Sequence, residues 1–288
     1  MPLLLRLFAL LLASSALAGE ISRTPLVLSK GGTPDHPEVF DGKGLVIDLG
    51  TDVTDHAWKK EGDLWTSNGP LLQRPPLLAG QTAGLFVDDH PIPIPRNLEK
   101  EKAHPEKKGF CYIDPASLRP GQMGYGEDGS LYFRWPENQP PGSARLVLPA
   151  KAGVSAVVIA CSHIVVSNVT AMHAGNDGFN IHNGWTGIRL ENIRALSNGD
   201  EGISAHDEVE MTVDGAEIAW NGSVSGGVAD VNHCTTTYRN CVVHHNAGAA
   251  FHFSGKSHSV SDSEIHHQPR PFDIAKETAF TQTNVRTR

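Results

Sequence analysis

A repeat of 24 residues in the second half of the chain constrains its fold more than any other feature. The segment Ile164 to Val169 aligns with Ile188 to Ile193, and the alignment continues without a gap to Phe179 over Ile203. A looser copy follows at Met211 to Val231, and a clearer one returns at twice the spacing. Repeats of this length are typical of solenoids, in which each repeat stacks on the one before.

The composition of each repeat indicates which kind of solenoid forms. Each copy holds two short alternating runs rich in Val, Ile and Phe, with Asn and Gly at the turns, and no helical periodicity. Recurring Asn favours stacked turns, because its side chain tolerates left-handed backbone and bonds to its neighbours. We therefore expect an all-β fold, a right-handed parallel β-helix with coils ~4.8 Å apart. Alternation should point Phe179, Ile181, Ile203, Phe251 and Phe253 inward, and Asn180, His182, Ser204, His206 and His252 outward.

The first eighteen residues are expected to be a signal peptide. A positively charged start, the apolar run Leu7 to Leu12 and the small-residue site Ala16-Leu17-Ala18 have the order of a cleavable export signal. No later stretch reaches the ~18 apolar residues of a membrane helix. We therefore expect a secreted or periplasmic protein that does not bind a membrane.

The remaining chain is expected to divide at about residue 150. Before it, prolines are frequent and strand-like runs occur at Gly44 to Leu49, Gly84 to Val87 and Ser130 to Trp135. A short polar repeat near the end is expected to need a cover, because an open solenoid end exposes its core. The expected segments are the signal peptide (1–18), a β-rich lead-in with the first coils (19–150), regular coils (151–268) and a C-terminal tail or cap (269–288).

The charge balance limits the partners. The formal net charge is −8, whereas a nucleic-acid-binding protein needs a basic face, so nucleic acid is not expected as a partner. An acidic sugar is still compatible, because local cations or a bound metal can reverse the field. We expect a monomer.

Acidic residues occupy the same turn of two neighbouring repeats. Asn176-Asp177-Gly178 aligns with Asp200-Glu201-Gly202. Carboxylates stacked ~4.8 Å apart repel one another unless they share a proton or a cation. Calcium would satisfy them through carboxylate and amide oxygens, and it is the only cofactor that the sequence suggests. The two interpretations are a calcium-binding or catalytic turn made by Asn176, Asp177, Asp200 and Glu201, and a solvated acidic turn.

Histidines are concentrated in the same half, with ten of the fifteen between His173 and His267. His182 and His206 are equivalent outward positions on consecutive coils, and His252 has the same parity two coils later. Such imidazoles could act in acid–base catalysis near neutral pH, or form a structural ladder. Asp207 and Asp230 could orient an imidazole or donate a proton. For His233, His244 and His245 a place at the corners is the favoured interpretation.

Two kinds of side chain could bind a sugar. Trp185 and Trp220 lie near Asn- and Gly-containing turns, where an exposed indole could stack on a sugar ring or simply pack. Arg239 and Lys256 are among the few cations of this half and could bind a uronate carboxylate. The four cysteines, Cys111, Cys161, Cys234 and Cys241, lack zinc-site spacing, and burial as small apolar residues is favoured over disulfides.

Residues 150–268 resemble the pectate-lyase-like superfamily of right-handed β-helix proteins. Asn176-Asp177-Gly178-Phe179 and Asn198 to Ile203 are similar to the calcium-binding corners of family-nine pectate lyases, which implies that Asp177, Asp200 and Glu201 are ligands. A histidine, His252, stands where that family has its catalytic lysine, and it lies two coils after the acids. The runs at Leu85 to Asp88 and Gly129 to Phe133 are similar to the lead-in of β-helix glycoside hydrolases.

These features favour a secreted enzyme that cleaves glycosidic bonds of an acidic, uronate-containing polysaccharide. The residues leave β-elimination and hydrolysis equally open: an imidazole would remove the C5 proton in the first, and two carboxyl groups would act in the second. The alternative is a non-catalytic carbohydrate-binding or surface-structural β-helix.

Overall fold

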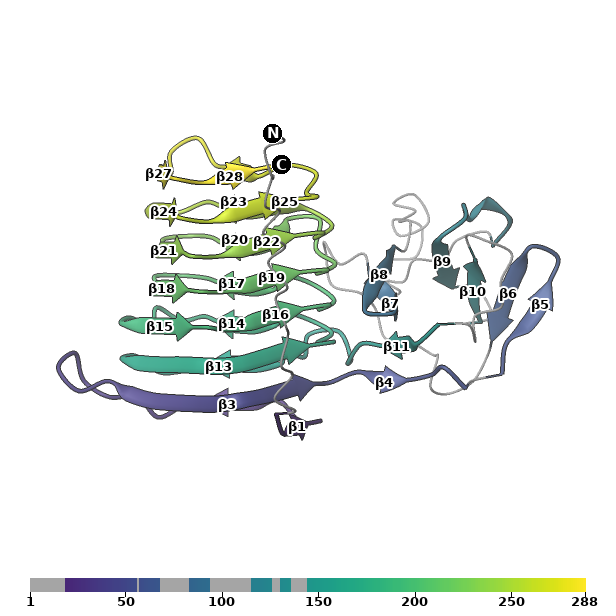
Figure 1. Cartoon of the computed structure of the whole chain (residues 1–288), viewed down its shortest axis with the longest axis horizontal. Coiled ribbons are helices and arrows are strands. Elements are labelled where there is room, and N and C mark those ends of the chain that lie inside the picture. The colour runs from purple at the N-terminus through teal and green to yellow at the C-terminus, as the bar shows by residue number, and fades with distance from the viewer. Residues whose placement is uncertain (1–18, 56, 68–82, 94–114, 126–129, 136–143) are drawn as a thin grey trace, which may run out of the picture.

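Stacked coils of parallel strands make up most of the protein (Figure 1). The computed structural model describes residues 19–55, 57–67, 83–93, 115–125, 130–135 and 144–288. The expected signal peptide and Cys111 lie outside these residues. One face of the stack is a seven-stranded sheet. Its strands, in spatial order, are β2 (Leu26–Leu28), β12 (Val157–Ile159), β14 (Phe179–Ile181), β17 (Ile203–Ala205), β20 (Gly226–Asp230), β23 (Ala249–Phe253) and β26 (Phe272–Ile274).

The other two faces belong to one thirteen-stranded sheet, in which the long strands β3 (Glu38–Asp48) and β13 (Ile164–Met172) span both faces. Beyond β13 the sheet splits into two branches, and β1 (Ile21–Ser22) pairs with β3. One branch contains β15 (Ile188–Glu191), β18 (Glu210–Asp214), β21 (Thr235–Arg239), β24 (Ser257–Ser261) and β27 (Ala279–Thr283). The other contains β16 (Arg194–Leu196), β19 (Glu217–Ala219), β22 (Val242–His244), β25 (Glu264–His266) and β28 (Arg286–Thr287).

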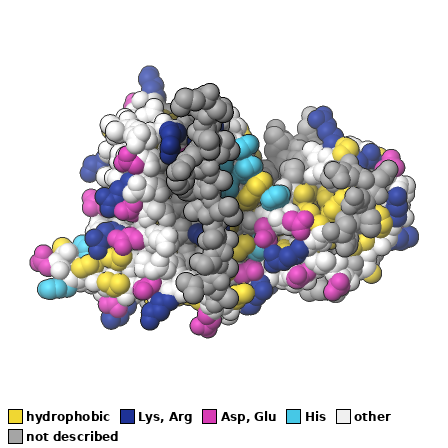
Figure 2. All heavy atoms as spheres, in the orientation of Figure 1, with side chains coloured by type: hydrophobic (Ala, Val, Ile, Leu, Met, Phe, Trp, Pro, Cys, Tyr) yellow, Lys and Arg dark blue, Asp and Glu magenta, His cyan; other side chains and the backbone are white. Residues whose placement is uncertain are grey.

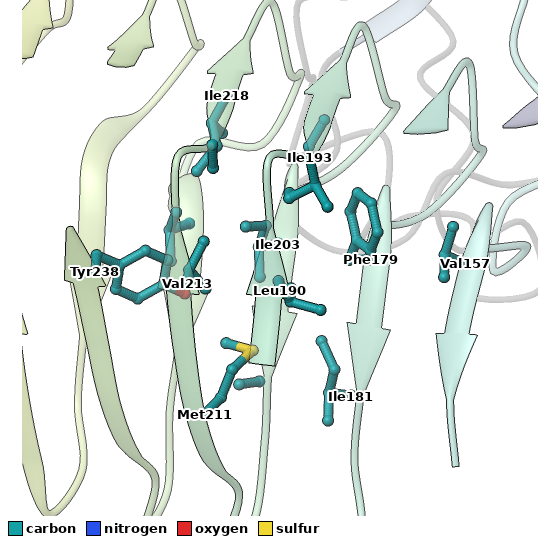
Figure 3. Packing of buried hydrophobic residues seen from close by; sticks show 14 of the residues in the cluster. Val157, Phe179, Ile181, Leu190, Ile193, Ile203, Met211, Val213, Ile218 and Tyr238 are labelled. Atoms are coloured by element: carbon teal, nitrogen blue, oxygen red, sulfur yellow. The ribbon is translucent and has the colours of Figure 1, made fainter. Parts of the chain in front are cut away.

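The strand register confirms the repeat. Phe179 pairs with Ile203 and Ile164 with Ile188, both 24 residues apart. Ile203 then pairs with Val228, which in turn pairs with Phe251. Each of these two spacings differs from 24 residues by only one residue. All five side chains expected to point inward are fully buried. Figure 3 shows Phe179, Ile181 and Ile203 directed into the space between the faces with Leu190, Ile193 and Met211. The apolar alternation therefore forms one continuous core.

A ladder of buried asparagines fixes one corner of the coils, as the recurring Asn predicted. Asn198 Nδ2 donates to Asn221 Oδ1 (2.9 Å), and Asn221 Nδ2 donates to Asn246 Oδ1 (2.8 Å). The corner next to the ladder has no room for a side chain at Gly178, where a Cβ would lie 2.7 Å from both Asn198 Nδ2 and the Gly202 carbonyl oxygen. Close packing at this corner sets the positions of the acidic residues beside Gly178 and Gly202.

A second unit, called here the insert, leaves the stack at the same corner, after β3, and returns before β12 (Figure 1). It has its own apolar cluster and two antiparallel four-stranded sheets, together with a 3-10 helix at Pro115–Ser117. One sheet is β4 (Thr51–Asp52), β11 (Leu146–Leu148), β7 (Ala83–Val87) and β8 (His90–Pro93), and the other is β5 (Lys59–Glu61), β6 (Leu64–Ser67), β10 (Leu131–Arg134) and β9 (Gln122–Tyr125).

In the described part of the chain, no helix is long and apolar enough to cross a membrane.

The turn between β7 and β8 docks the insert on the stack. Asp89 Oδ1 lies 3.1 Å from Nε2 of the buried His173, whose Nδ1 lies 2.8 Å from Asp48 Oδ1. The Ser197 hydroxyl donates to the Asp89 carbonyl oxygen (2.6 Å). Burial opposes a charged imidazole, but the interactions with the two carboxylates outweigh it and raise the pKa of His173. The two acids therefore favour the charged form of His173 at the place where the insert meets the stack.

The C-terminal segment continues the stack. Residues 269–288, expected as a tail or cap, form a further coil, in which β26 pairs with β23, β27 with β24 and β28 with β25. Its apolar residues are sparse but lie in register with the core, so that Phe272 stacks on Phe251 with ring centroids 5.8 Å apart. The polar character of this coil reflects its place at the end of the stack.

Candidate active site

Three acidic side chains meet at one corner, as the stacked turns predicted. Asp177 precedes β14, and Asp200 and Glu201 precede β17 one coil later. The Gly178 N–H donates to the Glu201 carbonyl oxygen (2.9 Å), which keeps the two turns together. One carboxylate oxygen from each residue lies within 4.8 Å of the other two. Their exposed fractions are only 3%, 7% and 9%, so the cluster is a buried acidic site and not a solvated turn.

Amide and hydroxyl groups orient this acidic site. Asn176 Nδ2 and Asn180 Nδ2 both donate to Asp177 Oδ2, at 2.9 and 2.6 Å. The Ser223 hydroxyl donates to Glu201 Oε1 at 2.6 Å. These donors fix the carboxyl groups before any ligand arrives.

Burial changes the protonation of the two carboxyl groups at the centre. Burial, followed by the charge of Asp200, raises the pKa of Asp177 to about 7. Burial, followed by the charge of Asp177, raises the pKa of Glu201 to about 8. The two side chains are hydrogen-bonded to each other, and two neighbouring carboxyl groups in such a site share a proton. The pair can therefore donate a proton near neutral pH.

The predicted imidazole pair lies beside these acids. The rings of His182 and His206 stack with centroids 4.2 Å apart and planes inclined by 21°. The Asn180 amide nitrogen lies 3.2 Å from His182 Nε2 and is a donor, so this ring nitrogen is the acceptor and carries no proton. Burial lowers the pKa of both histidines, and in His206 the neighbouring imidazole adds to that effect. Both rings are therefore neutral at neutral pH and can accept a proton.

Acids and imidazoles face a common pocket of about 260 Å³. His252 lines the same pocket, and its Nδ1 lies 3.0 Å from Asp273 Oδ2. None of the described residues that line the pocket is a lysine or arginine. The site thus combines proton donors with neutral proton acceptors in an acidic surrounding. Its lining consists of Asn176, Asp177, His182, Asp200, Glu201, Ser204, His206, Ser225, Ala229, Val231 and His252.

The acidic site also fits a hard divalent cation. Three carboxyl groups can each direct an oxygen to one point, and calcium prefers such oxygen donors. A cation would take the place of the shared proton, because both relieve the same repulsion between Asp177 and Glu201. The three residues that direct an oxygen to one point are Asp177, Asp200 and Glu201. Asn176 donates through its amide nitrogen to Asp177 Oδ2 and to Ser155 Oγ.

Asp230, a predicted catalytic residue, lies on the wrong side of its strand. It pairs with the inward positions Ala205 and Phe253 and is 0% exposed. Its Oδ2 accepts hydrogen bonds from the Thr236 hydroxyl (2.7 Å) and the Tyr238 hydroxyl (2.9 Å), and burial raises its pKa to about 7. Strand alternation places Asp230 in the core, away from the pocket, so that prediction was wrong.

Asp207 and the two tryptophans do not line the pocket. Asp207 is exposed and accepts a hydrogen bond from the Asn183 N–H (2.9 Å). Its charge opposes, without overcoming, the lowering of the His182 pKa by burial. Trp185 packs against the core. Trp220 is stacked between His90 (3.8 Å) and His245 (4.1 Å), so both faces of its indole are covered and cannot stack on a sugar.

The two predicted cations also lie elsewhere. Arg239 is on β21, in the thirteen-stranded sheet, and its Nε donates to Asp214 Oδ2 (2.9 Å). Lys256 is exposed in the turn before β24 and is not part of the pocket lining. Neither cation stands where it could bind a sugar carboxylate in this pocket. The described cysteines, Cys161, Cys234 and Cys241, are buried free thiols, as the favoured interpretation predicted.

Sequence reasoning missed Ser223 and the part that Asn180 plays. Asn180 lies between Asp177 and His182 with the outward parity of His182, so its contact with both could have been anticipated from alternation. Ser223 belongs to the irregular copy of the repeat, where a shift of one residue hides which side chain lies above Glu201.

Comparison with known protein families agrees with this architecture. Residues 150–284 match a family described as a right-handed beta helix region, which confirms the expected fold class. A solved structure described as a glycoside hydrolase is 10% identical, with a TM-score of 0.47 over 92% of this chain and 87% of that one. The complex structure of XylC with xylose is also 10% identical, with a TM-score of 0.48 over 94% of this chain and 64% of that one. No curated protein sequence matches the chain.

Proposed function

We propose that this chain, whose residues 150–284 match the right-handed beta helix family, is an exported enzyme that cleaves glycosidic bonds of a polysaccharide in the pocket beside Asp177 and Glu201. The observation that supports this proposal best is the hydrogen-bonded pair Asp177–Glu201, with pKa values raised to about 7 and 8, opposite two neutral imidazoles. A proton donor and a proton acceptor are thus present in one pocket at neutral pH.

Hydrolysis uses both groups. The protonated carboxyl group of Glu201 donates its proton to the glycosidic oxygen as the bond to the anomeric carbon breaks. A water molecule attacks that carbon and gives a proton to the neutral imidazole of His206. Because the described lining holds three carboxyl groups and no lysine or arginine, the pocket suits a neutral sugar better than a uronate.

A second candidate is β-elimination on a uronate, and the cluster of three carboxylate oxygens within 4.8 Å favours it. In that reaction Asp177, Asp200 and Glu201 would hold a calcium ion, which supplies the positive charge that neutralises the uronate carboxylate. A neutral imidazole of His182, His206 or His252 would accept the C5 proton.

The products separate the two reactions. We would incubate the full protein with a panel of neutral and uronate polysaccharides, and follow reducing ends and the ultraviolet absorbance of unsaturated sugars. Hydrolysis gives reducing ends alone, at a rate that a chelator does not change. Elimination gives both signals and stops when calcium is removed.

Matched variants locate the chemistry. Glu201→Gln and His206→Ala should each lower kcat by about 100-fold or more, since each removes a proton-transfer group. Asp35→Asn and His36→Ala, at exposed positions of the first coil, should keep full activity. Full activity in both site variants would contradict the proposal. Retention on a polysaccharide column without any cleavage would favour the non-catalytic binding module instead.

A further inference from the structure

A second cluster of ligating side chains lies at the corner next to the insert, and we propose that it binds a transition-metal ion of the zinc class. It consists of His244, His245 and His266. A ring nitrogen from each residue lies within 4.8 Å of the other two. This site is separate from the acidic pocket and does not depend on the proposed function.

The repeat itself builds this histidine cluster. The dipeptides His244-His245 and His266-His267 are 22 residues apart, and the strand register places His244 directly beside His266. The His244 and His266 rings stack with centroids 4.8 Å apart, and those of His245 and His267 with centroids 4.5 Å apart. Two consecutive coils therefore direct imidazoles to one place.

The Nδ1 atoms already face one another. His244 Nδ1 lies 2.9 Å from His245 Nδ1, and His266 Nδ1 lies 2.9 Å from His267 Nδ1. In a tetrahedral zinc site the nitrogens are ~2.0–2.1 Å from the metal, so ligating nitrogens stand somewhat farther apart than these pairs. A small outward rotation of each ring would admit the ion.

Glu217 gives an independent indication of metal binding. Its Oε1 lies 3.4 Å from Nε2 of His244, whereas His245 faces Nδ1, the other nitrogen of that ring. A histidine that binds a metal through one nitrogen usually donates its other N–H to a carboxylate, which fixes the tautomer and the ring orientation. Glu217 is itself held by Arg194, whose Nε lies 2.7 Å from Glu217 Oε2.

The donor atoms of the cluster suit a transition metal. Neutral imidazoles are the form that ligates metals, and nitrogen donors favour zinc, nickel or copper over calcium or magnesium. Three nitrogen ligands leave the fourth tetrahedral position to water or to His267.

The cluster also lies at the junction with the insert. Histidine side chains gather on the edge of the stack that faces the insert in Figure 2. His245 stacks on Trp220, which stacks in turn on His90 of the insert. A metal at His245 would therefore stiffen the row of rings that joins the two units.

Calorimetric titration of the full protein with zinc chloride tests the site. We expect binding of one ion per chain, retained in Asp177→Asn, which changes only the acidic site. His266→Ala should abolish it, and Glu217→Gln should weaken it by roughly ten- to a hundred-fold, as the loss of an outer-shell carboxylate does. The exposed His36→Ala serves as the matched control and should bind as the unaltered protein does.

A second measurement, the fluorescence of tryptophan, does not depend on the heat of binding. Copper(II) at His245 should quench the fluorescence of Trp220, and the quenching should be lost in Trp220→Phe and in His266→Ala. Absence of zinc binding, or zinc binding that survives in His266→Ala, would overturn the proposal. Loss of zinc binding in Asp177→Asn alone would assign the ion to the acidic site and would also overturn it.

Discussion

Burial keeps Glu201 in its protonated form, which the proposed chemistry needs. Holding this proton makes the folded state less stable at high pH than at low pH. Its pKa rises from 4.5 to about 8, because burial and then the charge of Asp177 disfavour ionisation. The folded protein therefore holds a proton that the unfolded chain releases above pH 4.5. The contribution of this group to stability is complete below pH 4.5 and is lost as the pH rises through about 8.

Glu201→Gln should remove this pH dependence. We expect the variant to have a higher Tm than the unaltered protein at pH 8, because the amide needs no proton, and a similar Tm at pH 4.5. Thermal unfolding followed by circular dichroism at both pH values measures the difference. A Tm at pH 8 below that of the unaltered protein would show that the Glu201 proton is not shared as described.

The buried Asp230 leads to a similar prediction for the pH dependence of stability. Burial raises its pKa from 3.8 to about 7, so its contribution to stability is present below pH 3.8 and lost as the pH rises through about 7. Asp230→Asn should therefore raise the Tm above pH 7 relative to the unaltered protein and leave activity intact, since the side chain does not line the pocket. Loss of activity in a folded Asp230→Asn protein would return this residue to the catalytic candidates.

At the scale of elements, the Asn198–Asn221–Asn246 ladder holds the corner that carries the acids. Asn221 is fully buried, accepts from the Asn198 N–H (3.0 Å) and donates to the Ala195 carbonyl oxygen (3.0 Å). Asn221→Ala leaves buried partners unsatisfied, each at a cost of roughly 1–3 kcal/mol, so the free energy of unfolding should fall by that order or more. Denaturant unfolding measures it.

Asn284, an exposed asparagine that bonds to the preceding coil, is the matched control. Asn284 Nδ2 donates to Asp262 Oδ1 (2.8 Å) at the surface, and Asn284 has a φ of 52°. Asn284→Gly keeps that backbone conformation, and water replaces the lost bond, so its unfolding free energy should change little. Equal losses in both variants would contradict the role given to burial.

The β7–β8 turn is the element that joins the insert to the stack. Asp89 Oδ1 lies 2.7 Å from Arg145 Nη1 and 3.1 Å from His173 Nε2. Asp89→Ala removes one of the two carboxylates that contact the buried imidazole of His173, so hydrogen exchange at fixed pH should become faster in Ala83–Pro93. Hydrogen exchange in the coils should not change. The control Asp55→Ala, at an exposed site in the insert, should leave exchange in the turn unchanged. Unchanged exchange in the turn would show that other contacts dock the insert.

At the scale of the whole molecule, each coil of the stack contacts only its neighbours, so the core at the end of the stack must be covered by the last coil. Phe272 and Phe280 lie over Phe251 and Phe253 and belong to the last coil. Removal of residues 269–288 would expose the buried rings of Phe251 and Phe253. We therefore expect a lower Tm and aggregation, measured by light scattering during heating. Removal of residues 286–288 alone, which are mostly exposed, should have little effect. A truncated protein that stays monomeric and equally stable would contradict the role of the last coil.

The sequence by itself determined the solenoid, because a 24-residue spacing and apolar alternation leave few ways to bury Phe179, Ile181 and Ile203. It also determined that Asp177 lies beside Glu201 and His182 beside His206, since parallel register carries equivalent positions into contact. Only the tertiary structure decided what lies across irregular turns and between units. A one-residue shift placed Asp230 inside and Ser223 beside Glu201, and the docking of the insert covered Trp220 with His90. Such contacts depend on small offsets in space that no repeat in the sequence records.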